Sequence, residues 1–242
     1  MYKESDLFKP IKDYFAPLGY TINAEVKGAD ITLLKDDVLT IIEIKKNFNI
    51  SLIYQAIDAQ KIADYVYIAI PRQKTKTPRQ RKTINLTRHI ATQLGLGIIT
   101  VAMDTESKKV EILLDPIHTK EIGLYKSYIK RKATTNEING RKVDLNKGGS
   151  TRKKLSTAYL EKAIQIACIM ENFEEVDTKT LIKQFDCPKE TTEILYRNYY
   201  KWFDKKQSRG VYALNNKGRK ELNNSDFKQI VDFYRGCSKE NG

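Results

Sequence analysis

The first half of the chain alternates between segments with helical and with strand-like spacing of apolar residues. Apolar positions three and four residues apart predict helices at 5–18, 52–63, 84–94 and 120–131. Runs of β-prone residues predict strands at 20–25, 29–34, 38–45, 65–70, 98–103 and 109–114. This alternation is typical of an α/β domain, which we place at residues 1–135.

A change of composition separates this domain from the rest of the chain. The segment 136–149 is rich in Asn, Gly and Lys, which is linker composition, and 242 residues suffice for two modest domains with their own cores. Its end, Gly148-Gly149 followed by Ser150-Thr151, is interpreted as plain linker; alternatively, its backbone N–H groups bind a phosphate. The second domain is therefore expected at 150–242.

The apolar pattern of the second domain predicts a winged helix-turn-helix. Helical spacing from Leu155 to Met170 is followed by a short helix at 178–185 and a candidate recognition helix at 189–202. A basic turn at 205–210 and a strand at 211–214 predict the wing. Such a domain places a helix in the major groove and the wing on the DNA backbone, although winged helices also serve as protein-docking modules.

This prediction gives roles to polar residues of the second domain. Base edges are expected to be contacted by Thr191, Thr192, Arg197 and Asn198. Phosphates are expected to be bound by Lys189, Lys201, Lys205, Lys206 and Arg209. Aromatic residues at helical spacing usually pack, so most of five are expected in the core: Tyr196, Tyr199, Tyr200, Trp202 and Tyr212.

Candidate chemistry lies in the hairpin formed by the second and third predicted strands. If Asp36-Asp37 forms a two-residue turn, Asp30 and Glu43 are equally far from it and lie opposite each other. Their Cβ atoms are then roughly 4.5–5.5 Å apart on one face of the hairpin. The period of two places Lys45 on the same face, whereas a three-residue turn would shift the register by one residue.

Two adjacent carboxylates repel each other, and a divalent cation removes that conflict. Hard oxygen ligands suit Mg²⁺ or Mn²⁺, which keep several waters and accept a substrate phosphate. The cation lowers the pKa of a bound water, and Lys45 orients that water or stabilises the transition state. A surface salt bridge in an ordinary hairpin is the alternative, but apolar flanks bury these charges, which is costly without a purpose.

Short motifs along nearly the whole chain carry a family resemblance. They are Asp30 with Glu43-x-Lys45, and the segments 4–7, 25–30, 55–58, 66–71, 114–116, 148–152 and 209–214. The first motif resembles the PD-(D/E)xK nuclease superfamily, with Ala29 in place of the leading proline. The ensemble is similar to an uncharacterised bacterial family classed as PD-(D/E)xK-type phosphodiesterases. The resemblance implies a restriction-endonuclease-like α/β core, in which helices flank a mixed central sheet, and an α+β winged helix-turn-helix domain.

The resemblance also implies catalytic roles, which fall on Asp30, Glu43, Lys45, Gln55 and Glu4. Asp30 and Glu43 would ligate the metal ion together with the carbonyl of Ile44, and Lys45 would position the attacking water. In the superfamily a carboxylate from the first helix and a glutamine from the helix after the lysine often complete the site. Glu4 and Gln55 match these positions, and the resemblance favours Glu4 over Asp6 or Asp13. Alternatively, Glu4 serves only to stabilise a helix N-terminus. Glu25 is a lower-ranked candidate.

The charge of the chain agrees with a nucleic-acid partner. There are 43 Lys and Arg residues against 30 Asp and Glu, which gives a net charge of +13. Binding of a polyanion releases counterions and gains from such a field. The segment 72–88 contains no acidic residue, and we interpret it as a flexible basic loop that leads into a helix. Its candidate DNA contacts are Arg72, Lys74, Lys76 and Arg79.

The remaining composition narrows the cellular context. Met1 leads into polar and amphipathic sequence without a signal peptide, and no apolar run approaches the roughly 20 residues of a membrane span. Three widely spaced cysteines and two distant histidines argue against disulfides, a zinc cluster or a histidine-based triad. We therefore expect a cytoplasmic protein without a membrane partner.

Two functional hypotheses follow. The first is a Mg²⁺- or Mn²⁺-dependent endonuclease of DNA, targeted by a winged helix, as in restriction or phage defence; RNA is a further possible substrate. Because one such site cuts one strand, cleavage of both strands would need a homodimer. The second is a non-catalytic DNA-binding regulator that keeps the nuclease fold. The presence of Asp30, Glu43, Lys45 and Gln55 together favours the enzyme.

Overall fold

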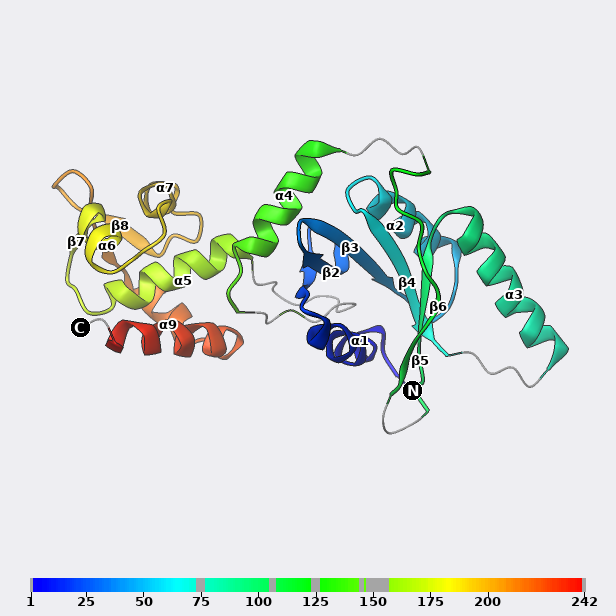
Figure 1. Ribbon diagram of the computed structural model, residues 1–242. Helices are drawn as coiled ribbons and strands as arrows, with labels where there is room; N and C mark the ends of the chain where they lie inside the picture. Colours follow the sequence, from blue (N-terminus) through cyan, green and yellow to red (C-terminus); the bar gives the residue numbers. More distant parts are fainter. Residues whose placement is uncertain are drawn as a thin grey trace. The chain divides into compact units, whose positions relative to one another are not determined.

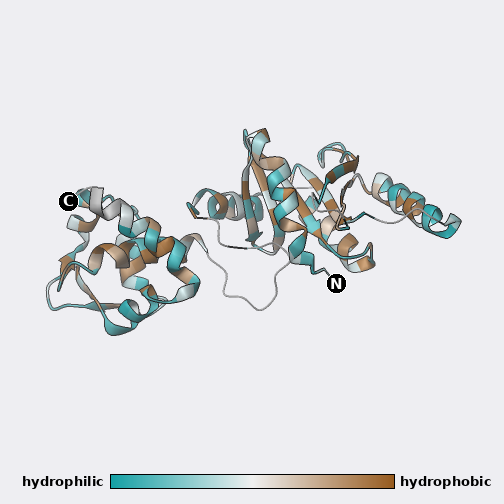
Figure 2. Ribbon diagram, turned by 90° about the horizontal axis from the view of Figure 1, so that it is seen from below, coloured by the Kyte–Doolittle hydropathy of each residue, from teal (hydrophilic) through white to brown (hydrophobic). Residues whose placement is uncertain are grey.

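The computed structural model describes residues 2–72, 77–104, 108–122, 127–143, 146 and 157–240. For residues 237–240 only the backbone is described. The chain divides into two compact units, one of residues 1–139 with 146–155 and one of residues 140–145 with 156–242 (Figure 1). Figure 2 shows apolar residues gathered inside each unit and polar residues on its outside. None of the helices in the described part of the chain is long and apolar enough to cross a membrane.

The first unit is built on a mixed six-stranded sheet whose strands follow the order of the sequence. The strands are β1 (Thr21–Val26), β2 (Ala29–Lys35), β3 (Val38–Ile44), β4 (Tyr65–Pro71), β5 (Gly97–Val101) and β6 (Val110–Leu114). The pairs β3–β4 and β4–β5 are parallel, and the other three pairs are antiparallel. This arrangement is consistent with the PD-(D/E)xK-like core expected from the sequence.

Helices cover both faces of this sheet and bury a separate apolar core on each. The helices are η1 (Glu4–Asp6), α1 (Phe8–Phe15), η2 (Ala16–Leu18), α2 (Ile50–Gln60), α3 (Pro78–Gln93) and α4 (Tyr128–Asn139). One core joins α1 to Ile31, Ile42 and Ile99 of the strands. The other joins α2, α3 and α4 to residues such as Ile41 and Ile68. Successive residues of a strand therefore face the helices on opposite sides of the sheet.

The register of the β2–β3 hairpin is the one predicted from the sequence. Ile31 pairs with Ile42 and Lys35 with Val38, so Asp36 and Asp37 form a two-residue turn. Both turn residues have positive φ angles, 49° and 61°. Two consecutive positive φ angles are required by the type I′ turn, whose twist matches that of the flanking strands. Continuation of this register brings Asp30 opposite Glu43.

Two helices of the first unit differ from the predictions. The segment 72–88 is not a loop as far as 84, because α3 begins at Pro78 with Thr77 as its N-cap; Thr77 Oγ1 accepts from the Gln80 N–H at 3.2 Å. The predicted helix 120–131 is replaced by α4, which begins at Tyr128 and continues to Asn139. The first residues of the predicted linker 136–149 are therefore helical.

The second unit combines six helices with a small three-stranded sheet. The helices are α5 (Ala158–Met170), α6 (Thr178–Gln184), α7 (Thr191–Arg197), α8 (Asn216–Leu222), η3 (Ser225–Phe227) and α9 (Lys228–Glu240). The strands β7 (Val176–Asp177), β8 (Phe203–Lys205) and β9 (Val211–Leu214) are antiparallel in the order β7-β9-β8. They enclose one apolar core that contains Trp202 and Phe227.

The predicted recognition helix 189–202 is longer than the helix observed. α7 ends at Asn198, whose φ of 43° is left-handed. The Asn198 side chain stabilises this end, because its Oδ1 accepts from the Trp202 N–H at 3.0 Å and its Nδ2 donates to the Phe203 carbonyl at 2.6 Å. Of the five aromatic residues expected mostly in the core, Trp202 and Tyr212 are buried and Tyr200 packs against the core. Tyr196 and Tyr199 are each 77% exposed, so the prediction is wrong for these two.

Candidate active site

The end of the β2–β3 hairpin holds two buried carboxylates side by side. Asp30 and Glu43 are only 8% and 3% exposed, and both face the side of the sheet that α2 covers. The N–H of Ile44 donates a hydrogen bond of 2.8 Å to Asp30 Oδ2, which holds that carboxylate against β3. Asp30 and Glu43 also share a side-chain hydrogen bond. This arrangement is the one that the hairpin register requires.

Burial changes the protonation of the pair. Removal from water is the largest effect on Glu43, and with the neighbouring charge of Asp30 it raises the pKa of Glu43 to about 9. Burial likewise raises the pKa of Asp30 above its ordinary value, although the Ile44 N–H and the charge of Lys45 oppose this rise. In the absence of a cation the pair therefore retains a proton at neutral pH.

The donor set of the pair fits a divalent cation. Glu43 Oε2 is buried and accepts no hydrogen bond from the described residues, which is uncommon for a buried oxygen. A hard cation would satisfy this oxygen and displace the shared proton. In the described ranges no three or more His, Cys, Asp or Glu side chains are grouped to hold a metal ion. An ion bound by Asp30 and Glu43 would thus retain coordination positions for water and substrate, as Mg²⁺ usually does.

Lys45 and Glu4 meet next to this pair. Lys45 follows β3, and its Nζ lies 3.5 Å from Glu4 Oε2, with both side chains largely shielded from solvent. The other Glu4 oxygen accepts from the Lys46 N–H at 3.4 Å. Glu4 thus contacts the segment that follows β3, which is distant from it in the sequence. Asp6 and Asp13, the alternatives on the same segment, instead bond the Lys3 N–H and Lys9.

Gln55 lies on α2, the helix that covers this face of the sheet. It shares the inward stripe of α2 with Leu52 and Ala56, and the N-cap Asn49, whose Oδ1 accepts from the Leu52 N–H at 2.9 Å, begins that helix. Gln55 Oε1 is buried without a hydrogen-bond partner among the described residues. Glu25, the lower-ranked candidate, has a left-handed φ of 51° in β1, and its charge contributes to the raised pKa of Glu43.

Comparison with protein families identifies the group to which the chain belongs. A family model described as "Putative PD-(D/E)XK phosphodiesterase (DUF2161)" matches residues 99–221, slightly more than half of the chain. The chain is a member of this PD-(D/E)XK phosphodiesterase family. The matched segment begins after Asp30, Glu43, Lys45 and Gln55, so the roles of these residues rest on their geometry. No curated protein matches the chain.

Basic residues of the first unit lie near the same end of the sheet. Arg72 directly follows β4, and Arg79 is exposed in the first turn of α3. Arg72 forms an ion pair with Glu111 of β6, in which Nη2 and Oε2 are 3.4 Å apart. Lys74 and Lys76, predicted as further DNA contacts, lie outside the described residues. So do Gly148–Arg152, one of the motifs of the family resemblance.

In the second unit the structure exposes most of the predicted DNA contacts. The exposed ones are Lys189, Thr192, Arg197, Lys201, Lys205, Lys206 and Arg209. Arg197 pairs with Glu193 one turn earlier, at 2.8 Å. Thr191 is a correction: it is fully buried, and its hydroxyl donates to the carbonyl of Pro188. A buried threonine whose hydroxyl is bonded to the backbone cannot contact base edges.

The sequence prediction missed one residue on the sheet face that carries the carboxylate pair. Thr100 of β5 is 3% exposed, and its Oγ1 has no hydrogen-bond partner within the described part of the chain. A threonine in a β-prone run gives no signal of this kind, because the lack of a partner depends on the residues that pack around it.

Proposed function

We propose that the protein is a divalent-metal-dependent nuclease that hydrolyses phosphodiester bonds of DNA. The observation that carries this proposal is the buried Asp30–Glu43 pair with its unbonded Glu43 oxygen, next to the ammonium of Lys45. Membership of a PD-(D/E)XK phosphodiesterase family supports the reaction class. The net charge of +13 supports a polyanionic substrate.

Each residue of the site has a task in this reaction. Asp30 and Glu43 hold the metal ion together with the carbonyl of Ile44, and the bound Mg²⁺ or Mn²⁺ supplies Lewis acidity toward the phosphodiester. Lys45 orients the attacking water and stabilises negative charge that develops on the phosphate. Glu4, 3.5 Å from the Lys45 ammonium, holds that side chain in place. Gln55 directs its unbonded amide oxygen to the attacking water.

We further propose that the second unit is a winged helix that targets the enzyme to DNA. The order of its elements supports this: α5, the short strand β7, α6, α7 and then the β8–β9 hairpin. The loop of that hairpin carries exposed Lys206 and Arg209, which suit a wing on the phosphate backbone. Arg197, exposed on α7, is the side chain that we expect to contact base edges.

One experiment tests the reaction and its substrate together. Purified full-length protein is incubated with single- and double-stranded DNA, with base-modified DNA and with RNA, in Mg²⁺, Mn²⁺ or EDTA. We expect metal-dependent cuts in DNA, and sequencing of the cut ends then reports the site preference. Asp30→Asn serves as the inactive control and Asp13→Asn, a change of an exposed carboxylate in α1, as the matched active control. Cleavage that persists in EDTA, or no cleavage of any substrate, would refute the proposal.

The same reactions examine strand cutting and biological role. A single metal site cuts one strand, so we propose that a homodimer cuts both. The ratio of nicked to linear plasmid, followed against protein concentration, measures this dependence. Selective cutting of modified or unmodified DNA would support a role in restriction or phage defence.

A further inference from the structure

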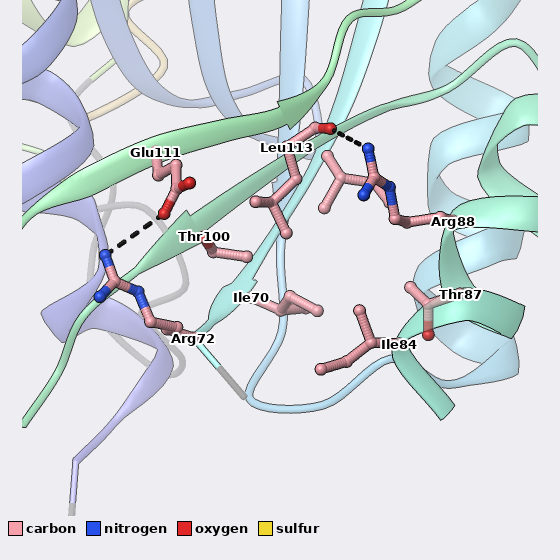
Figure 3. Close-up of a pocket in the computed structure, with 9 residues that line it drawn as sticks. Ile70, Arg72, Ile84, Thr87, Arg88, Thr100, Glu111 and Leu113 are labelled. Atoms are coloured by element: carbon pink, nitrogen blue, oxygen red, sulfur yellow. Dashed lines mark hydrogen bonds and ion pairs between the residues drawn. The ribbon is translucent and has the colours of Figure 1, made fainter. Parts of the chain in front are cut away.

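A cavity of about 250 Å³ lies between α3 and the sheet of the first unit. Figure 3 shows its apolar walls, which include Ile70 of β4, Ile84 of α3 and Leu113 of β6. Pockets for drug-sized ligands are usually larger, roughly 300–1,000 Å³. The size and the walls therefore suit a small, flat, mainly apolar group.

Thr100 gives this cavity one polar contact. It lines the cavity from β5, is 3% exposed, and its Oγ1 is one of three buried side-chain oxygens in the described residues that have no hydrogen-bond partner. The other two belong to Glu43 and Gln55 of the proposed nuclease site. A buried hydroxyl without a partner costs about 1–3 kcal/mol. Such an oxygen therefore indicates a group that a ligand completes.

The cavity opens on the same side of the sheet as the carboxylate pair. Glu43 is paired with Ile68 of β4, Ile68 is paired with Ile98 of β5, and Thr100 lies two residues further along β5. With strands about 4.8 Å apart and a rise of about 3.3 Å per residue, the Cα atoms of Glu43 and Thr100 are about 12 Å apart. A nucleotide next to a phosphate held at Glu43 can span this distance to Thr100.

Two arginines lie at the rim of the cavity. Arg88 of α3 donates from Nη2 to the Leu113 carbonyl at 3.1 Å. At the opposite side of the cavity, Arg72 forms an ion pair with Glu111 (Figure 3). Each guanidinium has five N–H donors in a planar arrangement, which matches the oxygens of a phosphate. The cavity thus combines an apolar interior, one hydroxyl, and a rim that carries two arginines and the carboxylate of Glu111.

We propose that this cavity binds a nucleobase whose phosphate lies against Arg72 and Arg88. The apolar walls take the faces of the base, and the Thr100 hydroxyl bonds its edge. In a duplex the base must leave the stack, at a cost of a few kcal/mol that is smallest for mismatched or unpaired bases. This proposal rests on the proposed function, because it places the base next to a phosphate bound at Asp30 and Glu43.

The test uses binding, so that it does not depend on cleavage. Full-length protein with Asp30→Asn is titrated with duplexes that contain 2-aminopurine or an abasic position, and 2-aminopurine fluorescence reports unstacking. Ile84→Phe fills the cavity and Thr100→Val removes the hydroxyl at nearly constant volume; Thr92→Val, an exposed change near the end of α3, is the matched control. Free mononucleotides form a separate arm.

We expect the fluorescence to rise with the parent protein and with Thr92→Val, and to be lost with Ile84→Phe. Thr100→Val should weaken binding of the base-containing duplex about five- to tenfold, as expected for one hydrogen bond, without affecting the abasic duplex. A response to free mononucleotides alone, with the same dependence on Thr100, would support the cavity with a free nucleotide as its source. An unchanged fluorescence rise in Ile84→Phe would overturn the proposal. Absence of metal-dependent cleavage with an intact fluorescence response would instead refute only the proposed nuclease function.

Discussion

Removal of the proton that the carboxylate pair holds should change how the stability of the protein depends on pH. Glu43 is 3% exposed and its pKa is raised to about 9, whereas an unfolded glutamate titrates near 4.3. Between these values the folded protein keeps a proton that the unfolded protein has lost. A rise in pH therefore favours unfolding, and the Glu43→Gln variant, which has no proton to lose, should not show this loss.

The magnitude follows from the linkage between protons and folding. One extra proton in the folded state lowers the free energy of unfolding by about 1.4 kcal/mol for each pH unit. From pH 6 to pH 8 the wild type should therefore lose roughly 2–3 kcal/mol more than Glu43→Gln. Because both proteins share all other titrating groups, the difference between them reports the proton that Glu43 contributes to the pair.

Urea denaturation in EDTA at pH 6, 7 and 8, followed by circular dichroism, measures this difference. Asp13→Asn, a change of a carboxylate whose side chain is 60% exposed, is the matched control and should parallel the wild type. Saturating Mg²⁺ should flatten the wild-type dependence, because a bound cation displaces the proton. Stabilities of wild type and Glu43→Gln that fall in parallel would show that Glu43 adds no proton to the folded protein and would refute the reasoning.

Three further predictions concern the proposed catalytic and DNA-binding groups. Glu4→Ala and Gln55→Ala should each lower the cleavage rate about 10- to 100-fold at saturating DNA, as expected for one lost charge-assisted hydrogen bond, and full rates would show that both are structural. Replacement of Lys205, Lys206 and Arg209 by glutamine should lower the affinity for all DNA sequences. It should also reduce the slope of log binding constant against log salt concentration by up to about 3, measured by electrophoretic shift in rising salt. An unchanged slope would identify a protein-docking module. Arg197→Ala should alter the preferred cut sequence, read by sequencing of cut ends, without a change in salt slope.

The sequence was sufficient to predict the arrangement of the carboxylate pair. Asp36-Asp37 forms a two-residue turn with positive φ at both positions, and β-prone runs flank it on either side. These local features determine the register, and the register brings Asp30 opposite Glu43. The choice of Glu4 over Asp6 came from the family resemblance, and its contact with Lys45 depends on the packing of the whole unit.

Helix boundaries were predicted less well because polar contacts, some of them with distant residues, determine them. The helix predicted at 120–131 was expected to end at Arg131, but α4 continues past it. The Arg131 guanidinium donates to Asp64 at 2.7 Å and to the Asp37 carbonyl at 2.8 Å, and Ile138, two turns later, packs in the core. α7 ends early because the Asn198 side chain bonds the backbone of the following strand. The partners of Arg131 are distant in the sequence, and the polar contacts of Asn198, although local, do not appear in an apolar pattern.

The buried Thr191 and the unbonded Thr100 show the same limit for single residues. Thr191 was assigned to base edges from its place on a predicted recognition helix, yet its hydroxyl bonds Pro188 at the helix start. Thr100 looks like any β-branched strand residue until the cavity around it is known. Exposure and hydrogen-bond partners are properties of the packed protein, so residue type alone does not reveal them.

The central claim is that Asp30, Glu43 and Lys45 form a metal-dependent phosphodiesterase site. Its most direct test is the single-turnover rate of DNA cleavage as a function of Mn²⁺ or Mg²⁺ concentration, in the wild type and in Asp30→Asn. We predict that the wild-type rate rises with metal to a plateau and disappears in EDTA. The Asp30→Asn rate should be lower by about 10³-fold or more, since removal of one key charge-stabilising group already costs about 10²–10³. Wild-type rates in Asp30→Asn, or rates independent of metal, would contradict the claim.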